Sequence, residues 1–155
     1  MLYTNQNIRV QWGATLSNLC TVSNVVKQGG VMSPILFTIY IDQLLCQLRE
    51  SNLGCHIGRE FYGALGYADD IILLNPTLYS LRAMLEICSN FAESYDVKFN
   101  PTKSKLLYFG SNEPKSVISP ISFMGGTIEI VPYETYLGNI IGQNPYKFQM
   151  HDALI

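Results

Sequence analysis

Two adjacent aspartates, Asp69 and Asp70, lie inside one of the most apolar stretches of the chain, ALGYADDIILLNP at residues 64–76. Ionised carboxylates repel each other, and their burial is costly unless a partner or a metal compensates their charge. One interpretation is a solvated turn, since aspartate is common in turns. The other is a divalent metal site, because Mg²⁺ prefers carboxylate oxygens and a pair of such ions supports phosphoryl transfer. The spacing alone leaves both interpretations open.

Two other segments carry groups that suit a phosphate-bearing ligand. KQGGVMSP, residues 27–34, places two glycines directly before an expected helix N-terminus, where close backbone approach and helix-terminal amides favour phosphate. Gln28 in this segment could bond a sugar or a base edge. FNPTKSKLLYFG, residues 99–110, places Lys103 in a loop, where its ammonium could meet a phosphate or donate a proton. The simpler alternatives are a glycine turn before a capped helix and a solvated lysine.

A hairpin and a helix are expected before the aspartates. Residues 1–27 alternate loosely between apolar and polar, and Trp12-Gly13 is typical of a turn. Ser33 as a capping residue and Pro34 at the first helical position indicate a helix over about 34–50. Its apolar residues cover most of its circumference, so the helix is expected to be buried on more than one side.

The aspartates themselves are expected at the bend between two strands over 60–75. Asn75-Pro76-Thr77 then ends the second strand and caps an amphipathic helix over about 78–95. The acids would therefore stand at the tip of a hairpin whose strands are apolar.

The C-terminal third is expected to consist of strands. VKFN and KLLYFG, residues 97–100 and 105–110, predict a strand pair, Gly125-Gly126 predicts a hairpin, and ETYLGNIIG, residues 134–142, predicts a further strand. The order of elements predicts an α+β fold, with a mostly antiparallel sheet and helices packed on one face.

Composition narrows the class of protein. A chain of 155 residues, 48% hydrophobic and 14% charged, is long enough for one domain and unusually apolar. The net charge of −2 gives no bulk attraction to nucleic acid. Four cysteines without CxxC spacing support neither a zinc site nor a disulfide framework, and favour a reduced compartment. No signal peptide or membrane span is expected, which favours an intracellular location, nuclear or cytoplasmic.

Four motifs in order carry a family resemblance. KQGGVMSPILF, YADDIILL, FNPTKSK and YLG together resemble the reverse transcriptases, the palm of RNA-directed DNA polymerases, and most of all those of LINE-type non-LTR retrotransposons. The resemblance spans about residues 3–142. It implies a polymerase palm-like fold and nucleotidyl transfer by two Mg²⁺ ions. Its implied partners are an RNA template, a DNA primer and deoxynucleoside triphosphates.

The resemblance also implies a role for each matching residue. Asp69 and Asp70 would be catalytic metal ligands, and Lys103 would help to protonate the departing pyrophosphate. Nucleotide or template contacts would fall to Gln28, Gly29, Tyr67 and Ala68. A primer-gripping hairpin would contain Tyr136, Leu137 and Gly138, for which the alternative is an ordinary buried strand.

The sequence departs from the family pattern upstream of the glycine segment. The family carries a further catalytic aspartate there, whereas residues 1–41 contain no Asp or Glu. We therefore expect a chain truncated at both ends. Residues 1–120 would be a partial palm without fingers or that aspartate's strand, and residues 121–155 a primer-grip-like hairpin and the start of the thumb connection. It would be a polymerase fragment that is inactive alone. The alternatives are a non-catalytic palm remnant that binds nucleic acid or protein, and an unrelated α+β domain.

Overall fold

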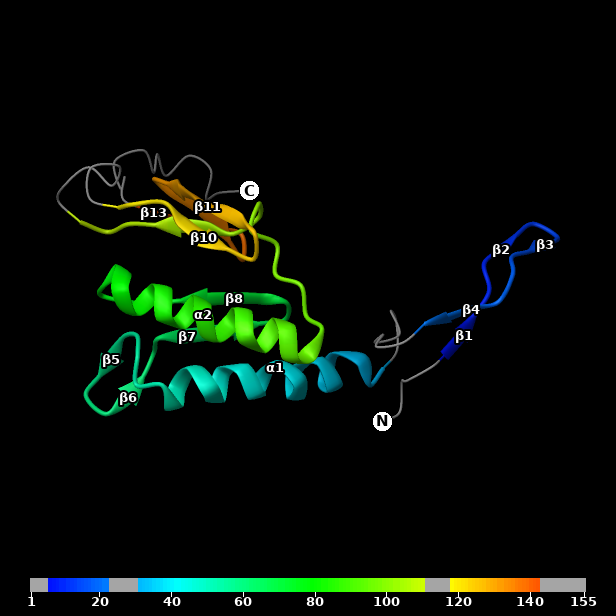
Figure 1. The fold of residues 1–155 in the computed structure, drawn as a ribbon, viewed down its shortest axis with the longest axis horizontal. Helices are drawn as coiled ribbons and strands as arrows, with labels where there is room; N and C mark the ends of the chain where they lie inside the picture. The colour runs from blue at the N-terminus through cyan, green and yellow to red at the C-terminus, as the bar shows by residue number, and fades with distance from the viewer. Residues whose placement is uncertain (1–5, 23–30, 111–117, 143–155) are drawn as a thin grey trace. The chain divides into compact units, whose positions relative to one another are not determined.

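The chain forms two compact units, residues 1–91 and 92–155, in a computed structural model that describes residues 6–22, 31–110 and 118–142. Each unit is described by itself below, with its helices and strands labelled as in Figure 1. Helix α2 crosses the boundary between the units. The predicted division at residue 120 separates the palm from the primer-grip-like region of the family, which is a different kind of division, and it stays a prediction.

The N-terminal residues form an antiparallel ribbon, as predicted. β1 (Gln6–Ile8) pairs with β4 (Cys20–Val22), and β2 (Gln11–Trp12) pairs with β3 (Thr15–Leu16). The chain turns directly after Trp12, where Gly13 has φ +59°. The ring of Trp12 is 87% exposed at the tip.

Helix α1 (Ser33–Glu50) confirms the predicted helix, but its capping residue and its burial on more than one side were predicted wrongly. Its buried residues Ile41, Leu44 and Leu48 share one face, and Ile35 and Ile39 on the opposite face are exposed. Ser33 is the first helical residue, and the N-cap is Met32, which makes no side-chain cap. The reason is that the first turn already closes one residue earlier, where the Leu36 N–H donates to the Met32 carbonyl at 3.0 Å. Pro34 lies in this first turn as expected, where its missing N–H costs nothing.

Helix α2 (Leu78–Tyr95) has the predicted bounds and the predicted cap. The Ser80 N–H donates to Thr77 Oγ1 at 3.3 Å, and Asn75 Oδ1 accepts from the Thr77 N–H at 3.1 Å. The apolar face of α2 supplies much of the buried core. Its buried residues follow three- and four-residue steps: Met84, Cys88, Phe91 and Ala92.

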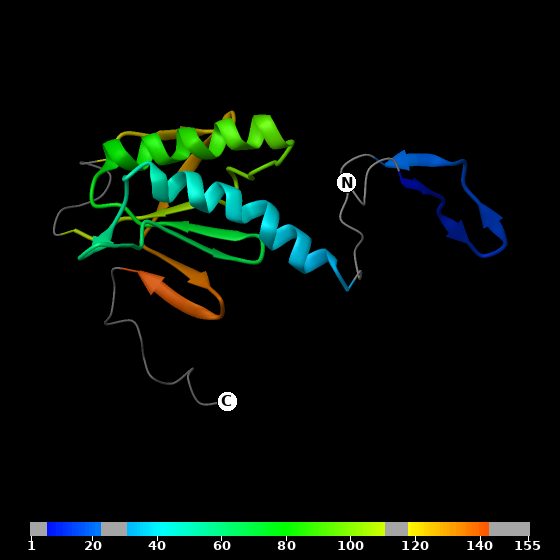
Figure 2. The ribbon, with the colours of Figure 1, turned by 90° about the horizontal axis from the view of Figure 1, so that it is seen from below.

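The first unit places its two helices together on one side of a hairpin. The rings of Tyr40 in α1 and Phe91 in α2 meet edge to face, with centroids 6.0 Å apart. Figure 2 shows α1 and α2 in one layer and the hairpin of β7 (Ala64–Tyr67) and β8 (Asp70–Leu73) in another. A smaller hairpin precedes it, made of β5 (His56–Ile57) and β6 (Glu60–Phe61).

The second unit contains a three-stranded sheet and a separate hairpin. β10 (Ile121–Phe123) pairs antiparallel with β11 (Gly126–Val131), and β11 pairs parallel with β9 (Lys105–Leu107). The hairpin joins β12 (Tyr133–Tyr136) to β13 (Asn139–Gly142).

The structure corrects three expectations for these strands. Residues 97–100 are no strand: β9 pairs with β11 instead, and the Ser104 N–H donates to the Asn100 carbonyl in the turn before it. The predicted Gly125-Gly126 turn lies one residue earlier, at Met124-Gly125, so Gly126 begins β11. The single strand predicted over 134–142 is the β12–β13 hairpin.

The α+β class is supported, with antiparallel pairing everywhere in the described residues except between β9 and β11. These strands form separate ladders rather than one continuous sheet. No helix within the described part of the chain has the length and apolarity needed to cross a membrane.

Candidate functional site

Asp69 and Asp70 lie at the tip of the β7–β8 hairpin, as predicted. Tyr67 pairs with Asp70, which leaves Ala68 and Asp69 as a two-residue turn. Ala68, Asp69 and Asp70 are all exposed. Asp69 in the turn and Asp70 at the start of β8 therefore place two exposed carboxylates at the tip of the hairpin.

Ala68 holds an unfavourable backbone conformation in this turn. Its φ is +51°, the left-handed region in which a Cβ costs about 1–2 kcal/mol. Glycine would adopt this conformation without that cost. Strain of this kind concentrates at functional sites, where the surrounding structure must hold it.

The two faces of the hairpin have different surroundings. A Cβ placed on Gly66 would lie 3.2 Å from Cδ1 of Leu45 in α1, so Gly66 and its partner Ile71 face the helices. Side chains alternate along a strand, and cross-strand partners share a face. Tyr67 and Asp70 therefore share the opposite, open face, where Tyr67 is 61% exposed. A phenol ring and a carboxylate stand side by side there.

The base of the hairpin is held by a contact between two glycines. Gly54 has φ +96°, and a Cβ on it would lie 2.8 Å from the Cα of Gly63 and 3.1 Å from the Leu74 carbonyl oxygen. The Cys55 N–H donates to the Leu74 carbonyl at 3.0 Å, which joins the loop after α1 to the hairpin, and the Leu74 N–H donates to the Gly63 carbonyl at 2.8 Å within the hairpin. Because neither glycine has a side chain, the backbone of the loop after α1 contacts the hairpin closely, at the end opposite the aspartates.

The two carboxylates fit a magnesium site in part. They supply the oxygen donors that Mg²⁺ prefers, and this ion is commonly held by one or two carboxylates together with waters and substrate phosphates. Within residues 6–22, 31–110 and 118–142, no cluster of three or more His, Cys, Asp or Glu side chains could hold a metal. Among the described His, Cys, Asp and Glu side chains, Asp69 and Asp70 would therefore hold a metal at this tip without a third, and water, substrate phosphates or other groups would complete its coordination.

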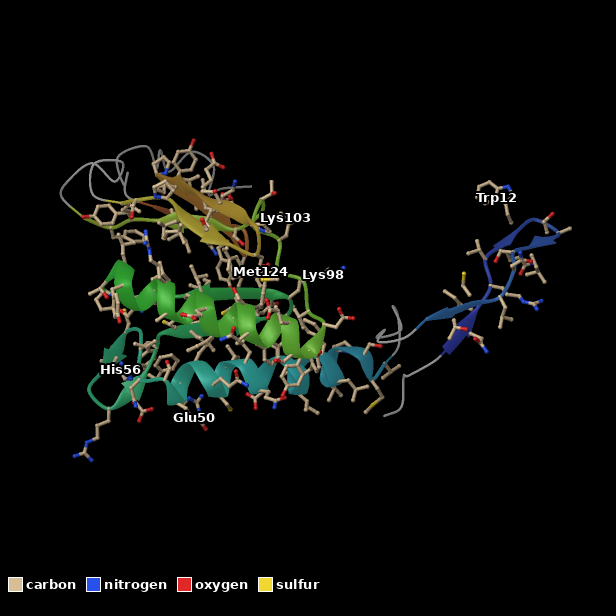
Figure 3. The ribbon with its side chains drawn as sticks, in the orientation of Figure 1. Trp12, Glu50, His56, Lys98, Lys103 and Met124 are labelled. Atoms are coloured by element: carbon tan, nitrogen blue, oxygen red, sulfur yellow. The ribbon has the colours of Figure 1, made fainter. Side chains whose placement is uncertain are left out.

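Lys103 belongs to the second unit, on the loop between α2 and β9 (Figure 3). Its side chain is exposed, and residues 101–103 form a turn. Gln28 and Gly29 lie outside the described residues.

Tyr136, Leu137 and Gly138 lie at the tip of the β12–β13 hairpin. Leu137 and Gly138 are its two turn residues, with φ +49° and +79°, the type I′ pattern that suits a two-residue hairpin. Leu137 is 51% exposed, so the alternative of an ordinary buried strand is wrong.

Three residues that shape these sites were not recognised from the sequence. Gly54 and Gly63 form their contact only in the folded chain, and no local pattern indicates it. Asn100 organises the turn that carries Lys103. The dipeptide Asn100-Pro101 could have indicated this, because Asn-Pro favours turn initiation.

Comparisons with known proteins agree with the motifs. A family model described as "Reverse transcriptase (RNA-dependent DNA polymerase)" matches residues 3–147. A Retrovirus-related Pol polyprotein from type-1 retrotransposable element R2 of Popillia japonica is 36% identical over 98 residues, 63% of this chain and 14% of that protein. The Pol polyprotein from type-2 retrotransposable element R2DM of Drosophila melanogaster is 33% identical over 108 residues, 68% of this chain and 10% of that protein. The chain thus spans a small part of these relatives.

Proposed function

The chain belongs to the reverse transcriptase family, the RNA-dependent DNA polymerases, and we propose that it carries the metal-binding hairpin of a non-LTR retrotransposon polymerase. The observation that supports this most is the β7–β8 tip, where Asp69 lies in the two-residue turn and Asp70 is the first residue of β8, so that two adjacent carboxylates stand at one end of the hairpin. We propose the polymerase activity, with its substrates and partners, for a longer protein of which this chain would be a part.

Asp69 and Asp70 would hold Mg²⁺, which when bound activates the attacking hydroxyl and stabilises the charge of phosphoryl transfer. Tyr67 lies on the same open face as Asp70, where its ring would support the primer terminus or the incoming nucleotide. The turn at Ala68 fixes the separation of these groups. The paired strands β7 and β8 would then supply the positioning on which catalysis of this kind depends.

The remaining motifs would contact the other substrates. Lys103 would donate a proton to the departing pyrophosphate, since its ammonium is exposed on a fixed loop. Tyr136, Leu137 and Gly138 would contact the primer strand through the tip of their hairpin. Gln28 and Gly29 would shape the pocket for the incoming nucleotide and the template base.

Binding of Mn²⁺ as a substitute for Mg²⁺ tests this assignment, measured by water-proton relaxation on the 155-residue chain. We expect Asp69→Asn to weaken binding about tenfold or more, because a charged ligand is removed. Glu60→Gln is the matched control, since Glu60 is an exposed carboxylate beside another two-residue turn of the same unit. The proposal fails if Asp69→Asn and Glu60→Gln leave Mn²⁺ binding equally unchanged.

A non-catalytic binding module is the second candidate. The exposed side chains of Leu65 and Tyr67 favour it, since alternate residues of β7 share one face and these two offer apolar surface there without needing a metal. The double variant Asp69→Asn/Asp70→Asn distinguishes the two candidates in a primer–template binding assay. Binding that is unaffected by the double variant and by chelation of Mg²⁺ would favour the binding module.

We expect no primer extension by the 155-residue chain alone. Its described residues bring no third carboxylate to the hairpin tip, and loss of such a ligand removes much of the positioning that accelerates the reaction. Incorporation of nucleotides that depends on Asp69 would contradict this expectation.

A further inference from the structure

Four hydrogen bonds converge on Asn100 in the second unit. Its side-chain oxygen accepts from the backbone N–H groups of Thr102 at 3.0 Å and Lys103 at 3.3 Å. Its backbone carbonyl accepts from the N–H of Ser104 at 3.1 Å and from Ser104 Oγ at 2.9 Å. Because two N–H donors point at the same side-chain atom, that atom is the amide oxygen. Asn100 therefore closes residues 100–104 into one turn.

An apolar contact anchors the same turn to the sheet. A Cβ on Gly126, the first residue of β11, would lie only 2.7 Å from Cγ of Pro101. The absence of a side chain at Gly126 is thus what admits the proline ring. Pro101 follows Asn100 directly, so the start of the turn is held by polar bonds and by packing together.

The end of the turn is fixed by strand pairing. β9 begins at Lys105, which pairs with Glu129 of β11 in a parallel register. Lys105 Nζ lies 2.5 Å from Glu129 Oε2, and this ammonium lowers the pKa of the Glu129 carboxyl. Between these two anchors the backbone of Lys103 is held in place while its side chain stays exposed.

We propose that Asn100 is a positioning residue that sets where the Lys103 ammonium is presented. The inference rests on the proposed function of Lys103. A lysine side chain is long and flexible, so a phosphate contact forms more readily if the backbone below it is already ordered. Asn100 provides that order through Lys103's own N–H, without touching the phosphate itself.

Amide hydrogen exchange on the full 155-residue chain tests whether Asn100 orders the turn that carries Lys103. Asn100→Ala removes the acceptor, and exchange of the Thr102 and Lys103 amides should accelerate about fivefold, as expected for one lost hydrogen bond. Asn100→Asp keeps an acceptor oxygen and should preserve protection. Asn90→Ala, at an exposed position of α2, is the control. Unchanged exchange in Asn100→Ala would overturn the proposal.

Binding of inorganic pyrophosphate in the presence of Mg²⁺ tests whether Asn100 supports the phosphate contact of Lys103. Lys103→Met should weaken binding about tenfold, since it removes a charge-assisted hydrogen bond. Asn100→Ala should weaken it about threefold, and Asn100→Ser, which restores an uncharged acceptor, should recover most of that loss. The double variant Asn100→Ala/Lys103→Met should bind like Lys103→Met alone, because Asn100 acts through Lys103.

The outcomes separate the two proposals. If Lys103→Met leaves pyrophosphate binding unchanged, the proposed function of Lys103 is wrong and the role of Asn100 falls with it. If Lys103→Met weakens binding but Asn100→Ala does not, the positioning role alone is overturned. Additive losses in the double variant would likewise overturn it, since Asn100 would then act independently of Lys103.

Discussion

Replacement of Gly54 by alanine tests how the aspartate hairpin is held. Two costs are expected at this position. Gly54 has φ +96°, and its new Cβ would lie 2.8 Å from the Cα of Gly63, a backbone atom that cannot rotate away. Either that backbone or the loop after α1 must shift, and both carry hydrogen bonds to the base of the hairpin.

The expected loss of unfolding free energy for Gly54→Ala can be compared with that for Gly58→Ala in the same unit. Positive φ costs a residue with a Cβ about 1–2 kcal/mol, and overpacking against fixed atoms adds about 1–3 kcal/mol, which gives about 2–5 kcal/mol for Gly54→Ala. Gly58 has φ +64°, but a Cβ there would meet nothing within 4 Å. Gly58→Ala should therefore cost only the backbone strain, about 1–2 kcal/mol.

Urea unfolding of the two variants and the parent chain measures the difference. The midpoint for Gly54→Ala should fall further than that for Gly58→Ala with the slope unchanged, as expected for a loss of stability without a change in the unfolded state. Mn²⁺ binding should weaken in Gly54→Ala and not in Gly58→Ala, because only the former displaces the hairpin base. Equal losses of stability in the two variants would refute the glycine contact as the support of the site.

Two further perturbations address the turn and the core. Ala68→Gly should raise the free energy of unfolding by about 0.5–1 kcal/mol, because relief of the positive φ outweighs the added chain entropy of glycine; a lower urea midpoint would contradict this. Burial raises the pKa of the Cys88 thiol from 9.0 to about 12, so above pH 9 the unfolded chain loses this proton while the folded chain keeps it. Stability should then fall with rising pH, by up to about 1.4 kcal/mol per unit. Urea midpoints between pH 8 and 10 check this, and Cys88→Ala should have a shallower pH dependence.

The sequence alone predicted those parts of the fold that depend on neighbouring residues. The apolar periodicity and the Thr77 cap predicted α2 at its observed bounds, and the apolar strands flanking Asp69 and Asp70 predicted the hairpin and its bend. These predictions succeeded because helix periodicity, capping and tight turns depend on contacts within a few residues.

Tertiary structure decided the pairings between distant segments and the contacts that support the site. The parallel register of β9 with β11 and the contact of Gly54 with Gly63 join distant segments, and no local sequence pattern in one segment indicates its partner. Local pattern placed the Asp pair at a turn, but only the approach of Leu45 to Gly66 shows which face of that hairpin is covered and which is open. The physical reason is that burial and close backbone approach are properties of the packed chain, whereas turn and helix preferences belong to short stretches of it.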